Sequence, residues 1–175
     1  MTGAGVIRPA TPADRPWIED LLREQWHSTQ VVTHGEIIDA AALPALVAED
    51  RRGLATWRRL GSDAELITLN AVPTGRGTGS ALIEALVRML QEQDCQRLWL
   101  TTTNDNVSAL TFYLLRGFRL LHVAPGAIDA ARRQKPTISL IGRHGIPIHD
   151  ELARCRFIGT QDTSTAPPWC DVTRG

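Results

Sequence analysis

Residues 71–82 read AVPTGRGTGSAL, and this stretch joins a short apolar segment to a long helical pattern. Three glycines alternate with Arg76 and Thr78. Glycine lets the backbone approach an anion because it has no Cβ, and the free N–H groups at a helix start attract negative charge. Arg76 can add a charged fork. The stretch therefore predicts either a phosphate-binding loop or a tight strand-to-helix turn without a ligand.

Two common nucleotide loops do not fit this spacing. A Walker-type loop needs a lysine after its last glycine, and none follows these glycines. The dinucleotide fingerprint GxGxxG fails because Ser80 occupies its third glycine position, and no acidic residue ends the next strand pattern at Thr101–Thr103. A nicotinamide enzyme that uses this loop remains an alternative, which binding of NAD to the protein would reveal.

The hydrophobic pattern on both sides of the loop predicts an alternation of strands and helices. Strands are predicted at residues 6–9, 46–48, 54–57, 65–72, 97–103 and 118–123, with a final strand within 148–157. Helices are predicted at residues 14–26, 81–90 and 107–116, with a short one at 127–133, while 30–42 shows no clear pattern. A turn at residues 50–53 joins two early strands, so part of the sheet is expected to be antiparallel. The order indicates a mixed α/β (α+β) fold.

Length and charge limit the possible classes of protein. The chain has 175 residues, which fits a single domain over residues 1–160, with a polar, proline-containing tail at 161–175. Lys plus Arg equals Asp plus Glu at 19 each, whereas nucleic-acid binders usually carry a basic excess. No apolar run approaches the roughly 18 residues of a membrane helix. We therefore expect a cytoplasmic protein without nucleic-acid or membrane partners.

The cysteines and histidines predict no metal centre. The chain has three cysteines without CxxC spacing, and free thiols in a reducing compartment are the simplest interpretation. His144, His149 and Cys155 match no zinc-ligand spacing, so a solvated loop is the better interpretation.

A second motif lies about thirty residues after the glycine loop. Residues 106–118 read NVSALTFYLLRGF, in which Asn106 can cap a helix and Gly117 can end it. Together with the loop, this segment resembles the GCN5-related N-acetyltransferase (GNAT) superfamily. The residues that occupy the second motif of the family are Asn106, Ala109, Tyr113, Gly117 and Phe118. In the loop, Gly77 and Gly79 match the glycine positions, while Thr74 stands where the family has Arg or Gln.

The resemblance implies a mostly antiparallel central sheet flanked by helices, in which a splayed parallel strand pair forms the cleft for acetyl-CoA. The backbone of Asn70, Ala71 and Val72 would pair with the pantetheine arm, and one N–H there would polarise the thioester carbonyl. The pyrophosphate would lie on the loop, and further contacts would come from the later helix and its approach. These implied residues are Gly75, Arg76, Gly77, Thr78, Gly79 and Ser80, followed by Asn104, Asn106, Ala109, Phe112 and Tyr113.

The implied reaction is direct attack of a primary amine on the thioester. Tyr113, the only tyrosine of the chain, would protonate the departing thiolate. A base must take the proton of the amine, and Glu65, Glu36 and His34 are candidates among which the sequence does not choose. A non-catalytic acyl-CoA-binding or sensor module on the same fold is the alternative. The acceptor is expected to be a small-molecule or peptide amine, and a homodimer is common in the family.

Overall fold

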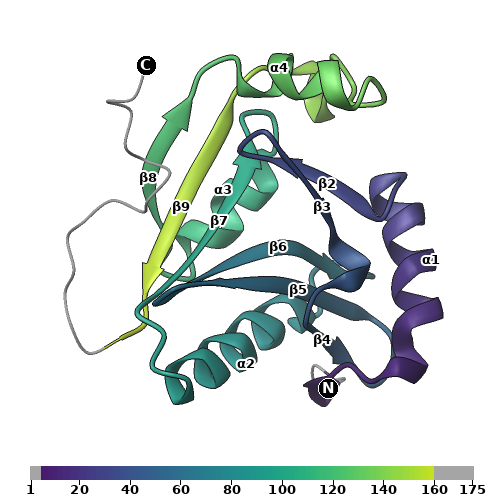
Figure 1. Cartoon of the computed structure of the whole chain (residues 1–175), viewed down its shortest axis with the longest axis vertical. Coiled ribbons are helices and arrows are strands. Elements are labelled where there is room, and N and C mark those ends of the chain that lie inside the picture. The colour runs from purple at the N-terminus through teal and green to yellow at the C-terminus, as the bar shows by residue number, and fades with distance from the viewer. Residues whose placement is uncertain (1–4, 160–175) are drawn as a thin grey trace.

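The computed structural model describes residues 5–159 and is built around a seven-stranded sheet (Figure 1). Across the sheet the order is β1-β4-β5-β6-β7-β9-β8, and the only parallel neighbours in the described sheet are β6 and β7. The strands are β1 (Ile7–Pro9), β4 (Ala45–Ala48), β5 (Gly53–Leu60), β6 (Asp63–Ala71), β7 (Arg97–Thr103), β8 (Arg119–Ala124) and β9 (Glu151–Phe157). The predicted mixed, mostly antiparallel sheet is confirmed. The tail predicted at 161–175 lies outside the described residues.

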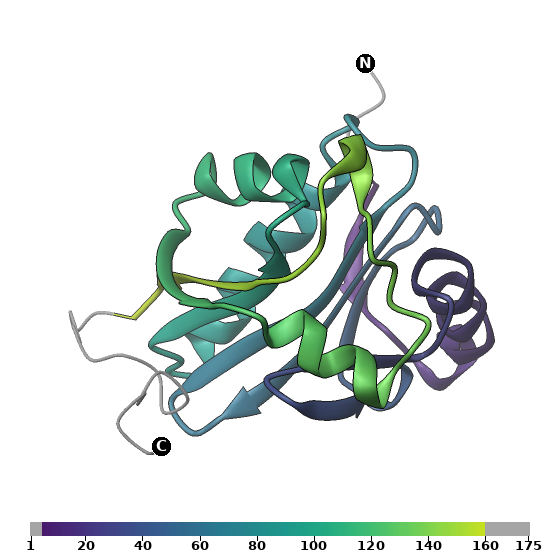
Figure 2. The same cartoon turned by 90° about the horizontal axis from the view of Figure 1, so that it is seen from above.

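Helices cover both faces of this sheet, as the view from above shows (Figure 2). One face carries α2 (Thr78–Glu92) and α3 (Val107–Leu114). The other face carries α1 (Arg15–Trp26), the hairpin of β2 (Gln30–Thr33) and β3 (Glu36–Asp39), and α4 (Ala127–Gln134). The described residues also form three short 3-10 helices, at Pro12–Asp14, Ala40–Ala42 and Arg143–Gly145.

Strand β6 divides two cores because its side chains alternate between the faces. Ala64 and Leu66 belong to the core under α2, whereas Ile67 belongs to the core under α1. On α2, Leu82, Leu86 and Leu90 recur every four residues and are fully buried. Burial of each such side chain contributes about 1.5–3 kcal/mol to the free energy of folding. The sheet therefore positions α2 firmly behind the glycine loop.

The parallel pair β6–β7 is closed at one end and open at the other. Asp63 and Arg97 face each other in register at the closed end, and their buried ion pair has a distance of 2.6 Å. The two strands pair over residues 63–66 and 97–100, and within the described chain the pairing stops there. Beyond it the strands splay apart, which leaves an edge of β6 free for another partner.

Most predicted elements are confirmed, with shifts at their ends. β5 continues to Leu60 rather than ending at residue 57, because it pairs with the start of β6. α2 begins at Thr78 rather than at residue 81. Residues 30–42, which showed no clear pattern, hold the β2–β3 hairpin, whose turn places His34 and Gly35 at φ values of 49° and 75°.

Asn106 and Gly117, which predicted the start and the end of a helix, lie at the two ends of α3. The Asn106 side chain accepts a hydrogen bond from the backbone N–H of Ala109 (3.2 Å). The helix ends at Leu114 rather than at residue 116, and Gly117 follows in the left-handed region with φ of 80°.

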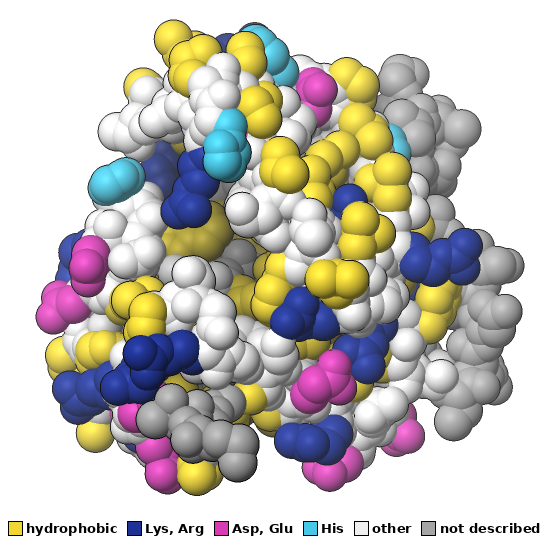
Figure 3. All heavy atoms as spheres, turned by 180° about the vertical axis from the view of Figure 1, so that it is seen from behind, with side chains coloured by type: hydrophobic (Ala, Val, Ile, Leu, Met, Phe, Trp, Pro, Cys, Tyr) yellow, Lys and Arg dark blue, Asp and Glu magenta, His cyan; other side chains and the backbone are white. Residues whose placement is uncertain are grey.

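Hydrophobic side chains gather over α3 and β8 on the face shown in Figure 3. Within residues 5–159, no helix is long and apolar enough to cross a membrane.

Candidate active site

A cleft of about 600 Å³ opens on the α3 side of the sheet. Figure 3 looks onto this side, where a hollow with hydrophobic side chains at its floor is visible. The cleft runs from the open end of β6 across the glycine loop to α3. Of the residues implied as cofactor contacts, those that line it are Ala71, Gly75, Gly77, Thr78, Gly79, Ser80, Asn106, Ala109, Phe112 and Tyr113.

The glycine loop has the geometry that its sequence requires. Gly75 and Gly77 adopt φ values of 84° and 80°, in the left-handed region that other residues rarely enter. Gly77 caps α2, so the first N–H groups of this helix face the cleft end of the loop. A Cβ on Gly79 would come within 3.2 Å of the Phe112 ring. The loop can therefore hold an anion against a bare helix start.

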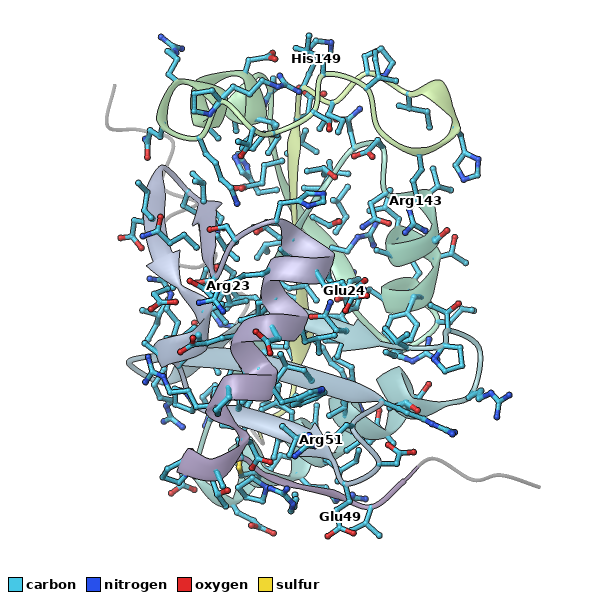
Figure 4. All side chains as sticks on the ribbon, turned by 90° about the vertical axis from the view of Figure 1, so that its right-hand side faces the viewer. Arg23, Glu24, Glu49, Arg51, Arg143 and His149 are labelled. Carbon is cyan, nitrogen blue, oxygen red and sulfur yellow. The ribbon has the colours of Figure 1, made fainter. Side chains whose placement is uncertain are left out.

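Arg116 places a guanidinium group beside this loop. Its Nε donates to Ser80 Oγ at 3.0 Å, Nη1 donates to the carbonyl of Phe112 at 2.7 Å, and the guanidinium stacks 3.5 Å from the Phe112 ring centroid. Burial lowers its pKa from the ordinary arginine value. Arg143 also lines the cleft and lies in the loop beside α3 (Figure 4). Sequence reasoning missed both arginines; the i to i+4 spacing of Phe112 and Arg116 is the one local signal.

Tyr113 lines the same cleft from α3. Its side chain packs edge-on against Phe112 and Phe118, with ring centroids 5.2 and 5.4 Å away. Only 9% of the residue is exposed, and this burial raises the pKa of the phenol above its usual range. Tyr113 therefore carries its proton at neutral pH.

Four other implied cofactor residues do not line the cleft. The Asn70 side chain points to the opposite face, where its Oδ1 accepts from Trp26 Nε1 at 3.2 Å. Val72, just after β6, and Arg76 in the loop are both exposed, and neither lines the cleft. Asn104 is held by the segment that precedes β9, because its Nδ2 donates to the Pro147 carbonyl at 2.8 Å. The backbone N–H of Val72 donates to the Arg52 carbonyl at 2.8 Å, on the β5 side of the strand, so Ala71 alone of the three residues implied to bind the pantetheine arm lines the cleft.

A second, smaller chamber of about 130 Å³ lies on the α1 side of the splayed strands. The β2–β3 hairpin forms one wall, and Thr33 Oγ1 bonds to Thr101 Oγ1 of β7 at 2.9 Å. Helix α4 forms another wall through Ile128, and Lys135 Nζ holds this helix to the hairpin by donating to the Gln30 carbonyl at 2.8 Å. Asn106 lines both the chamber and the cleft, so the two cavities meet at the open end of β6–β7.

The three candidate bases gather in one ionic cluster beside this chamber. Glu65 is 1% exposed, and its Oε2 accepts from Arg58 Nε at 2.6 Å. His34 lies between two carboxylates: its Nε2 is 3.5 Å from Glu65 Oε1, and its Nδ1 is 3.0 Å from Glu151 Oε1. Glu36 joins at the edge, where its Oε2 accepts from Arg58 Nη1 at 2.7 Å.

The side chains of this cluster differ in their protonation and in their access to the chamber. Burial opposes the charge of His34, but the hydrogen bonds to Glu151 and Glu65 outweigh it and raise the pKa of His34 to about 9. His34 therefore holds its proton at neutral pH and is a poor base there. The Glu36 side chain is 60% exposed and does not line the chamber, whereas Glu65 and Glu151 do. Sequence reasoning missed Glu151, because only the pairing of β9 with β7 brings it to this place.

The described part of the chain shows no metal centre: no three of its His, Cys, Asp and Glu side chains form a group that could hold an ion. Cys95 and Cys155 are both buried.

Comparison with known proteins identifies the class. A family model described as acetyltransferase (GNAT) family matches residues 66–118. The uncharacterized protein YdhI of Bacillus subtilis (strain 168) is 31% identical over 157 residues, covering 87% of this chain and 98% of that protein. The chain therefore belongs to the acetyltransferase (GNAT) family.

Solved structures share the fold at lower identity. The ribosomal-protein-S18-alanine N-acetyltransferase from Escherichia coli superposes with a TM-score of 0.62 at 15% identity, covering 93% of this chain and 99% of that one. A GNAT family acetyltransferase from Elizabethkingia anophelis, solved with acetyl-CoA bound, superposes with a TM-score of 0.61 at 16% identity, covering 87% and 97%. Both likenesses support the fold.

Proposed function

We propose that this protein is an acetyl-CoA-dependent N-acetyltransferase that moves the acetyl group to a primary amine by direct attack on the thioester. The observation that carries the proposal is the meeting of two unlike cavities at the open end of β6–β7. One has a glycine loop with two arginines, and the other has two carboxylates. An anionic donor and a cationic acceptor then approach the same point from opposite faces of the sheet.

On the donor side, the loop and the start of α2 hold the pyrophosphate of acetyl-CoA, and Arg116 adds the positive charge next to Ser80. The open edge of β6 binds the pantetheine arm as an added strand. An edge N–H polarises the thioester carbonyl, a contact worth roughly 3 kcal/mol in comparable oxyanion holes. The structure of an acetyl-CoA-bound relative in the same fold supports this placement.

On the acceptor side, the ammonium must lose its proton before nitrogen can attack. Glu65 takes this proton through a water molecule in the chamber, and Tyr113 gives its own proton to the leaving thiolate. Glu65 is the stronger candidate of the two predicted carboxylates because it lines the chamber, whereas Glu36 lies outside it. His34 and Arg58 fix the orientation of Glu65.

Thiol release tests this function. The purified chain is mixed with acetyl-CoA and a panel of primary amines, and the free thiol and the N-acetyl product are measured together. Stoichiometric thiol and acetylated amine support the transferase. Tight CoA binding without product for any amine would contradict it and favour a non-catalytic acyl-CoA-binding module. Thermal protection by NAD but not by CoA would favour the nicotinamide alternative.

A further inference from the structure

The smaller chamber has an unusual balance of charge. Glu65 and Glu151 both line it, and no Lys or Arg does among the residues of the described chain. Arg58 reaches Glu65 from outside the lining, and His34 lies between the two carboxylates. With Glu36 included, three carboxylates face two cations, so the cluster keeps a net charge of −3 + 2 = −1 when His34 is protonated.

The two carboxylates are not equivalent. Glu65 contacts two cations of the described chain, Arg58 and His34, whereas Glu151 contacts His34 alone. Glu151 is 7% exposed and stands at the start of β9, opposite Thr103 of β7. The uncompensated negative charge of the chamber therefore lies nearest to Glu151.

The remaining walls limit size and polarity. Val31, Val32, Ile67 and Ile128 supply apolar surface, and threonine hydroxyls of β7 supply the polar part. A volume of about 130 Å³ is well below the roughly 300–1,000 Å³ of pockets that enclose a drug-sized ligand. The chamber fits a short aliphatic group next to the reacting nitrogen.

Resting on the proposed acetyl transfer, we propose that this chamber selects compact aliphatic primary amines that carry no carboxylate, and that Glu151 determines this preference. An ammonium ion compensates the charge left at Glu151. A carboxylate on the carbon next to nitrogen would lie within a few ångströms of Glu151 in a site with little water. At an effective dielectric constant of about 20, like charges about 6 Å apart disfavour binding by about 100-fold, and partial solvent access reduces this to about 10-fold.

Isobutylamine and valine form a matched pair, because they differ only by the carboxylate. We expect kcat/KM for isobutylamine to exceed that for valine by at least about 10-fold, after each value is divided by the fraction of unprotonated amine. Isoamylamine and leucine give the same comparison with one more methylene group. Glu151→Gln should reduce the ratio toward one, because it removes the charge and keeps a side chain of the same shape.

Glu84→Gln is the matched control. Glu84 also pairs with one cation, Arg156, but lies on α2 outside the chamber. This variant should keep the wild-type ratio. Far-ultraviolet circular dichroism of both variants shows whether they fold. If Glu151→Gln does not fold, Ile128→Ala, which widens the chamber, should raise kcat/KM for isoamylamine relative to isobutylamine.

The outcomes separate this inference from the function on which it rests. Acetylation of valine at the rate of isobutylamine would overturn the inference and leave the transferase in place. A ratio that Glu151→Gln leaves unchanged would remove Glu151 from specificity. A lack of thiol release with every amine, despite CoA binding, would instead overturn the proposed function.

Discussion

The donor cleft and the acceptor chamber are built in different ways although they meet at one residue, Asn106. The cleft is mostly backbone and small side chains, supplied by β6, the loop that follows it, and α3. The chamber is made of side chains from the β2–β3 hairpin, β6, β7, β9 and α4. A site made of consecutive backbone can be found from local spacing, whereas a site made of distant side chains depends on the fold.

The two cavities also differ in charge. Arg116 and Arg143 line the cleft, and Glu65 and Glu151 line the chamber. The chain as a whole has a formal charge of zero, so its composition hides two opposite local fields. Net charge describes long-range steering of partners and not the polarity of each pocket.

The largest expected effect concerns the point where the two sides meet. Tyr113→Phe removes the proton donor and keeps the ring that packs on Phe112 and Phe118. We expect kcat to fall by about 10²–10⁴-fold, the usual contribution of a general acid, with acetyl-CoA affinity unchanged. Single-turnover kinetics, together with equilibrium binding of CoA, measure both quantities. An unchanged chemical step would remove Tyr113 from the mechanism.

The second prediction tests the acceptor side through stability. The folded-state pKa of His34 is raised from 6.5 to about 9, so the folded chain binds more protons than the unfolded chain between these values. The contribution of His34 is therefore complete below pH 6.5 and lost as pH rises through about 9. The difference of about 2.5 units corresponds to at most about 3 kcal/mol.

Urea unfolding of the wild type and His34→Gln at a series of pH values measures this difference. The free energy of unfolding of the wild type, relative to the variant, should fall as pH rises from 6.5 to 9. Glu151→Gln removes one of the two carboxylates next to His34 and should shrink the fall. A constant difference across this range would show that the three side chains do not form a coupled cluster.

The third prediction tests the donor side. Arg116→Met keeps much of the apolar contact with Phe112 and removes the guanidinium beside Ser80. Loss of a charged hydrogen bond to phosphate should weaken CoA binding by about 10- to 100-fold. Calorimetric affinity for pantetheine, which has no pyrophosphate, should stay unchanged. Arg119→Met is the matched control because Arg119 is exposed on β8.

A uniform loss of affinity for CoA and pantetheine would show that Arg116 acts through the packing of α3 rather than on the phosphates. Unchanged affinity for both ligands would leave the loop and the start of α2 as the anion site.

The sequence predicted the donor side because its signals are local. The spacing of the loop glycines, the cap at Asn106 and the Gly117 that follows α3 are short-range requirements of backbone geometry, and each was found in place. The parallel pairing of β6 and β7 was implied by the resemblance to the GNAT superfamily, and the structure has it. The observed end of β5 and the observed start of α2 differ from the predicted ones, because strand pairing and packing decide where an element begins and ends.

The acceptor side could not be predicted in the same way. Glu36, Glu65 and His34 were separate candidates, and the fold joins them, because Arg58 pairs with both glutamates and His34 contacts Glu65. Glu151 carried no local signal, because β9 enters the sheet between β7 and β8, and its partner Thr103 on β7 lies far from it in sequence. The hairpin at 30–42 gave only weak periodicity, since its strands have four residues each.

The smallest expected effect concerns the loop itself. Gly77 and Gly126 are a matched pair: each caps a helix, each has φ near the left-handed region at 80° and 70°, and an added Cβ would meet nothing within 4 Å at either. Alanine at either position should therefore cost only backbone strain, about 1–2 kcal/mol in the free energy of unfolding.

Binding of CoA should distinguish the two variants. Gly77→Ala shifts the first N–H groups of α2 away from the pyrophosphate, so CoA affinity should fall by about 2- to 5-fold, the usual worth of a charge at a helix start. Gly126→Ala lies at the start of α4, outside the cleft, and should leave this affinity at the wild-type value. Equal destabilisation with equal CoA affinity would mean that the glycine loop is only a tight strand-to-helix turn, and that the arginines across the cleft bind the phosphates.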